Sequence, residues 1–184
     1  MTSSFAPASP QHQCEPMLSE SARATSGSEA RFRIDYPNSM PRLVKVIALD
    51  EVSRTRVDQI AALPFRHAAF FTLPSLENAP ASLPAESATV RGIAGDTTSL
   101  IEEIDSADLV VMLASAGSKA EAALLIGEAC RMRKVTAIGL ILRDAETIDA
   151  TIEPTLKTMR PFVTMLVIAS GAEYIEEMLN ALRA

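Results

Sequence analysis

The sequence predicts an α/β protein: a Rossmann-like three-layer sandwich with a mostly parallel sheet of about six strands. Residues 108–142 read without a gap as a strand, a small-residue turn, an amphipathic helix and a second strand, which together make a β-α-β unit. Strand and helix patterns alternate along the rest of the chain from residue 42 onward. With 184 residues, 48% of them hydrophobic, the chain is long enough for one domain with a substantial core.

The β-α-β unit is recognised by its hydrophobic periodicity. Residues 108–114 are almost continuously apolar and rich in Val and Leu, which is typical of a central strand covered on both faces. The following helix is expected over 118–133, because its apolar residues recur at helical spacing. That stripe consists of Ala122, Leu125, Ile126, Ala129 and Cys130. Ser118 and Glu121 have the spacing of a capping box at the start of this helix.

The remaining elements follow in chain order. Strands are predicted at 43–49, 65–73, 90–94, 108–114, 135–142 and 162–169. Helices are predicted at 53–63, 97–106, 118–133, 147–160 and near the C-terminus, where Ile175, Met178, Leu179 and Leu182 form an apolar stripe. A Pro, Ala and Ser-rich loop joins the second strand to the third over 74–86. Strict alternation of this kind predicts a doubly wound parallel sheet in a single domain, 42–184.

Residues 1–41 are expected to be a disordered tail. They are rich in Ser, Ala and Pro and show no apolar period, so they cannot bury enough surface to offset the entropy of ordering. Phe32, Ile34 and Tyr36 alternate with charged residues. This pattern suits a short edge strand or a docking segment for a protein partner, and it is equally consistent with chance in a linker.

Composition excludes several classes of function. The net charge is −6 and no basic tract is present, which argues against nucleic-acid binding. Cys14 and Cys130 give neither a disulfide framework nor a metal-ligand spacing, so a reduced cytoplasmic setting is expected. The longest apolar runs have the length of strands, which predicts neither membrane insertion nor secretion. Four acidic residues in the first forty argue against an organelle transit peptide.

A ligand site, if there is one, is expected where the strands end. In doubly wound sheets, ligands bind outside the carboxyl ends of the strands at the point where strand order reverses. The predicted ligand-binding residues are Gly95, Asp96, Thr97, Ser115, Gly117, Ser118, Lys119 and Ser170. A wider set of loop residues shares that edge: Asp50, Glu51, Thr72, Thr98, Arg143, Asp144 and Gly171. All of these residue types also serve helix caps and turns, and the capping-box spacing recurs at Ser99 with Glu102 and at Ser170 with Glu173.

Signatures of catalysis are absent from the sequence. There is no G-x-G-x-x-G, no Walker loop and no G-x-S-x-G elbow, so neither a cofactor nor a catalytic residue can be named. His67 is expected to be a structural histidine of the second strand, and Cys130 an inert core residue. No metal site is predicted.

Residues 107–121, ADLVVMLASAGSKAE, resemble the second signature of sugar isomerase (SIS) domains, an apolar strand followed by S-x-S-G-x-T-x-E. Asp108, Gly117 and Glu121 fall in register. The resemblance, which extends over 107–142, implies a loop that binds the phosphate of a phosphosugar through its hydroxyl groups. At the positions of those hydroxyls this chain has Ala114, Ala116 and Lys119.

The same strand is similar to that of the tubulin-like cell-division GTPases, which reads A-D-x-V-x-V-x-A-G before a phosphate loop. Their loop is longer and richer in Gly, and close approach of backbone to a triphosphate needs several glycines. The sequence therefore favours a binding or regulatory module with a degenerate phosphate site. Its ligand would be anionic and would meet the loop at 115–119.

Two other hypotheses stay open. In one, the chain is an enzyme acting on a phosphorylated small molecule, with Lys119 and Ser118 on the phosphate and Asp96 or Asp144 as acid and base. In the other, it is a structural subunit held in a larger assembly through its tail. A homo-oligomer is compatible with all three hypotheses.

Overall fold

The computed structural model describes residues 40–73, 85–144, 146–171 and 173–184. Contacts divide the chain into Met1–Asn38 and Ser39–Ala184, and every described helix and strand belongs to the second unit. Almost all of the predicted tail and most of the predicted 74–86 loop lie outside the described residues.

A seven-stranded, mostly parallel sheet forms the middle layer, with the order β4-β3-β2-β1-β5-β6-β7. Its strands are β1 (Val44–Ala48), β2 (Ala68–Thr72), β3 (Thr89–Gly92), β4 (Thr97–Ser99), β5 (Leu109–Ser115), β6 (Thr136–Arg143) and β7 (Met165–Ser170). Five neighbouring strands are parallel to one another: β2, β1, β5, β6 and β7. The strand β3 is antiparallel to β2, and β4 is antiparallel to β3.

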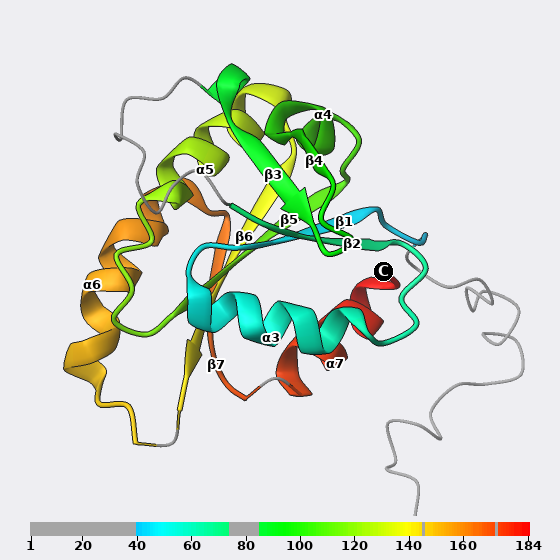
Figure 1. The fold of residues 1–184 in the computed structure, drawn as a ribbon. Helices are drawn as coiled ribbons and strands as arrows, with labels where there is room; N and C mark the ends of the chain where they lie inside the picture. Colours follow the sequence, from blue (N-terminus) through cyan, green and yellow to red (C-terminus); the bar gives the residue numbers. More distant parts are fainter. Residues whose placement is uncertain (1–39, 74–84, 145, 172) are drawn as a thin grey trace, which may run out of the picture. The chain divides into compact units, whose positions relative to one another are not determined.

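Helices cover both faces of the sheet (Figure 1). One face packs against α3 (Glu51–Ala61) and α7 (Glu173–Leu182), and the other against α4 (Leu100–Asp105), α5 (Ala122–Arg133) and α6 (Asp149–Met159). Two short 3₁₀ turns, Ala85–Ser87 and Arg160–Phe162, lie with α4, α5 and α6. This is the predicted three-layer Rossmann-like sandwich.

The central strand has the environment that its apolar run predicts. The first six residues of β5 are buried, and successive side chains enter the two opposite core layers. Val110 and Met112 pack towards α5, and Leu109 and Val111 towards α3 and α7. In α5 the predicted stripe is confirmed, because Ala122, Ile126, Ala129 and Cys130 are buried and Leu125 packs against them.

The prediction of strict strand and helix alternation is wrong at one place. β3 and β4 form a hairpin, closed by the N–H of Gly92 donating to the carbonyl of Asp96 at 2.9 Å. Gly95 has φ of 90°, the conformation that a three-residue hairpin loop requires at this position. Thr97–Ser99 is therefore a seventh strand, and the helix predicted from residue 97 begins only at Leu100.

The predicted capping boxes at Ser118 and Ser99 are also wrong. The helix α5 begins at Ala122, four residues later than expected, because Ala120 adopts a left-handed φ of 47° that interrupts the helix. The hydroxyl of Ser118 accepts a hydrogen bond from the N–H of Ala120, and Glu121 makes no side-chain cap. At α4, Ser99 occupies the N-cap position without a side-chain cap bond.

Candidate functional site

The strand order reverses between β1 and β5. The chain leaves β1 through α3 on one face and returns as β2, whereas it leaves β5 through α5 on the opposite face and returns as β6. Ala48 and Leu113 are paired near the carboxyl ends of these two strands. The loops that follow β1 and β5 therefore border the crevice in which doubly wound proteins bind their ligands.

The carboxylate of Asp50 links the start of α3 to the end of β5. Its Oδ1 accepts a hydrogen bond from the N–H of Ser53 at 2.8 Å, which caps the first turn of α3. Its Oδ2 accepts a hydrogen bond from the N–H of Ser115, the last residue of β5, at 2.7 Å. The N–H of Asp50 in turn donates to the hydroxyl of Ser53 at 3.1 Å, which completes a capping box. Both oxygens of Asp50 are thus engaged with backbone donors.

These donors are the groups that an anionic ligand would use. The N-terminus of a helix carries a partial positive charge and unpaired N–H groups, and phosphates bind there for this reason. In this chain the N-terminus of α3 and the β5 loop both point their donors at Asp50. The carboxylate of Asp50 therefore accepts hydrogen bonds from both of these elements.

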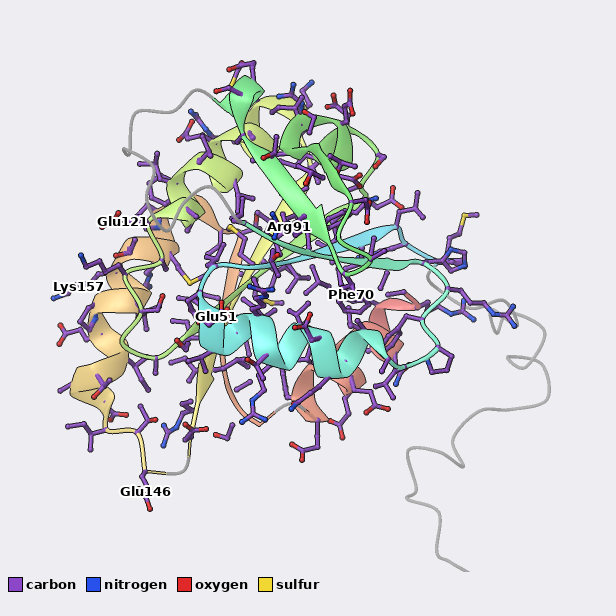
Figure 2. The ribbon with its side chains drawn as sticks, viewed as in Figure 1. Glu51, Phe70, Arg91, Glu121, Glu146 and Lys157 are labelled. Atoms are coloured by element: carbon purple, nitrogen blue, oxygen red, sulfur yellow. The ribbon has the colours of Figure 1, made fainter. Side chains whose placement is uncertain are left out.

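A small pocket lined by described residues lies beside Asp50. The pocket at this end of β1 and β2 has a volume of about 40 Å³, and Figure 2 labels two of the residues around it, Glu51 and Arg91. The others that line it are Ala48, Leu49, Asp50, Arg54, Thr72 and Leu73. This volume is far below the roughly 300–1,000 Å³ of a typical small-molecule site.

The loop after β5 is fastened to its neighbours. The N–H of Ala116 donates to the carbonyl of Leu142 at 2.8 Å, and the carbonyl of Ser118 accepts from the hydroxyl of Thr155 on α6 at 2.6 Å. Gly117 has φ of 86°, and an added Cβ there would come within 3.1 Å of the Thr151 methyl group. The side chain of Lys119 is exposed. The loop after β5 therefore contacts α6.

The predicted ligand residues do not meet in one place. Gly95 and Asp96 form the β3–β4 turn, and Thr97 begins β4. Because β3 runs antiparallel to β2, this turn points towards the edge of the sheet opposite to Ser115, with β2 and β1 in between. The expectation that these three residues follow a parallel strand is therefore wrong.

Ser170 lies at the correct edge but at a distance from the loop at 115–119. It ends β7 and pairs with Arg143, two strands away from β5. At a strand spacing of about 4.8 Å this separation is about 10 Å. Of the eight predicted ligand residues, Ser115, Gly117, Ser118 and Lys119 lie at the end of β5 and in the loop after it, whereas Gly95 and Asp96 share a different turn.

The sequence does not distinguish Asp50 from the other residues at strand ends, and its hydrogen bonds to Ser53 and Ser115 were not predicted. The local signal was present: Asp50 follows the apolar strand directly, and Ser53 stands three residues later, which is the spacing of a capping box. The bond to Ser115 spans 65 positions and leaves no local pattern.

His67 and Cys130 differ in their surroundings. His67 is exposed and precedes β2, which begins at Ala68, so the expectation that it lies within this strand is wrong. Cys130 is 1% exposed, and burial raises the pKa of its thiol to about 12, although Arg133 opposes this shift. In the part of the chain that the structure describes, no group of three or more His, Cys, Asp or Glu side chains could hold a metal ion. None of the described helices is long and apolar enough to cross a membrane.

We expect the Cys130 thiol to be unreactive in the folded protein. At pH 8 a group with a pKa of about 12 is almost entirely a neutral thiol, and only the thiolate attacks disulfide reagents. In a Cys14→Ser variant, a disulfide reagent should titrate no thiol rapidly at pH 8 and one thiol in guanidinium. Rapid reaction in the absence of denaturant would contradict the burial of Cys130.

No protein-family model matches the chain, and a search of curated proteins finds no match to it either.

Proposed function

We propose that this chain is a binding or regulatory module on a Rossmann-like domain whose phosphate site has been lost. The observation that supports this proposal best is the position of the Asp50 carboxylate, bonded to the N–H groups of Ser53 and Ser115. The proposal places the protein in the cytoplasm. It also assigns a protein partner to residues 31–36, in which apolar and charged residues alternate.

Electrostatics makes a phosphate unfavourable at this crevice. A phosphate could reach the same two donors only by displacing Asp50 or by lying beside it. Two like charges 4 Å apart repel by about 4 kcal/mol at an effective dielectric constant of 20. The Asp50 carboxylate also needs no ordering from solution, because its own helix holds it in place.

The resemblance to sugar isomerase domains agrees with a lost site. The three hydroxyl positions of that signature are Ala114, Ala116 and Lys119, and the side chain of Ala114 belongs to the core. A phosphate would therefore have to be held by backbone donors and Lys119 alone. Ser115 has already given its N–H to Asp50.

The alternative is an enzyme acting on a phosphorylated small molecule. Lys119 and Ser118 would bind the phosphate, and Asp144, which follows β6, would be the acid or base. Asp96 is a poor choice for that role because its turn points to the opposite edge of the sheet. This hypothesis predicts that phosphate stabilises the wild-type protein and that Lys119→Ala removes the effect.

A thermal-shift experiment with inorganic phosphate distinguishes the two hypotheses. We expect phosphate at about 10 mM to leave the melting temperature of the wild type unchanged relative to chloride at equal ionic strength. Asp50→Ser keeps a capping hydroxyl but frees the N–H of Ser115, so phosphate should raise the melting temperature of this variant by mass action.

Glu51→Gln is the matched control. Glu51→Gln removes one negative charge from the residue next to Asp50, in the first turn of the same helix. The Glu51 side chain does not accept from the N–H of Ser53 or of Ser115, which both donate to Asp50. The Glu51→Gln variant should respond to phosphate as the wild type does. Stabilisation of the wild type by phosphate, lost in Lys119→Ala, would overturn the proposal that the phosphate site has been lost.

A further inference from the structure

β7 has one free edge. It pairs with β6 on one side, and no described strand pairs with it on the other. Its six residues, Met165–Ser170, include no charged residue and no proline. Natural edge strands are usually protected by such residues, because unpaired N–H and C=O groups recruit further strands. The strand itself therefore carries none of the charged residues or prolines that usually oppose pairing at an edge.

A large apolar side chain projects from this strand. Ile168 is 43% exposed, and it lies on the α6 face of the sheet because it pairs with Ile141, whose side chain is in the core layer of α5 and α6. Leu166, two residues earlier, lies on the same face and packs partly into the same layer.

A pocket lies beside Leu166. It has a volume of about 410 Å³, between the end of α6 and the beginning of β7. Leu156, Val163 and Leu166 supply apolar walls, and Arg160 and Thr164 complete the lining. An isoleucine side chain fits this volume and this chemistry.

The exposed side chain and the pocket are complementary under one symmetry operation. A two-fold axis at Val167, perpendicular to the sheet, would make the β7 strands of two copies antiparallel neighbours. Ile168 of each copy would then stand opposite Leu166 of the other, at the mouth of the pocket, and both contacts would form at once. An isologous contact of this kind closes on itself and buries both apolar side chains.

We infer that β7 is the contact strand of a homodimer in which two sheets join through Val167 into one continuous sheet. A second copy suits this edge better than an unrelated partner, since the projecting residue and the pocket lie on the same face of the same strand, two residues apart. The inference is independent of the fate of the phosphate site.

The mass of the full-length protein in solution tests the inference. At about 100 µM, light scattering should give twice the 19.7 kDa of one chain. Ile168→Lys should restore the mass of a single chain, because a charge would enter the apolar pocket. Val52→Lys, on the exposed surface of α3, makes the same change of charge at an apolar residue and should leave the dimer intact.

A disulfide tests the position of the axis. In antiparallel strands, residues directly opposite each other have Cα atoms about 4.5–5.5 Å apart, within the range of a disulfide. In a Cys14→Ser background, Val167→Cys should form an intermolecular disulfide on oxidation at least tenfold faster than Thr55→Cys on α3.

Three outcomes would overturn the inference: a wild-type monomer at this concentration, an Ile168→Lys dimer, or equal cross-linking at residues 167 and 55. A wild-type monomer that Ile168→Lys destabilises would show that another segment of the same chain covers β7. Circular dichroism of each variant establishes that it is folded.

Discussion

Replacement of Ile126 by Ala is expected to lower the free energy of unfolding by about 2 to 5 kcal/mol, which denaturant titration measures. Ile126 is fully buried on α5, where it packs against the sheet. The loss combines the transfer energy of the removed methyl groups with the cost of a cavity that a close-packed core fills only partly.

Arg131→Ala in the same helix is the control for Ile126→Ala. The side chain of Arg131 is 75% exposed, and its ion pair with Glu128 is a surface pair of low energy. Its loss should change stability by no more than about 0.5 kcal/mol. If Arg131→Ala cost more than Ile126→Ala, the assignment of the buried face of α5 would be wrong.

Asp50→Ala should cost about 2 to 5 kcal/mol of stability. The substitution removes a helix N-cap, worth about 0.5–2 kcal/mol, and a charge-assisted hydrogen bond to Ser115, worth about 1.5–3 kcal/mol. Asp50→Asn keeps one acceptor oxygen for Ser53 and should recover part of the loss.

Glu51→Ala is the control for Asp50→Ala. Glu51 is exposed in the first turn of α3, and its ion pair with Arg54 is long at 3.4 Å. Its removal should cost no more than about 0.5 kcal/mol. Equal losses at residues 50 and 51 would mean that Asp50 acts only through its general charge near the helix.

The sequence predicts the layers of this protein well because burial has a local signature. The apolar run of β5 and the stripe of α5 mark strands and helices by their periods alone, and both have the predicted environment. Strand direction has no such signature. In β3 only Val90 is buried, and a single buried residue marks no particular strand direction. A short parallel strand and the first strand of a hairpin therefore look alike in the sequence.

The candidate site was harder to predict because it depends on direction and on distant contacts. Gly95 and Asp96 resemble a strand-end ligand loop in the sequence, but the antiparallel course of β3 turns them away from the carboxyl ends of the parallel strands. Asp50 resembles any other cap until the fold brings it to Ser115, and the strained backbone of Ala120 removes the predicted cap at Ser118.

A ¹H–¹⁵N NMR titration with inorganic phosphate tests the central claim most directly, because it reports on the two amides that Asp50 engages. In the wild type, the amide signals of Ser53 and Ser115 should show no saturable change. In Asp50→Ser, the amide of Ser115 should shift first and saturate, as phosphate takes the place of the carboxylate. A saturable shift in the wild type, centred on Ser115 or on Gly117 and Lys119, would contradict a site that the chain's own carboxylate has filled.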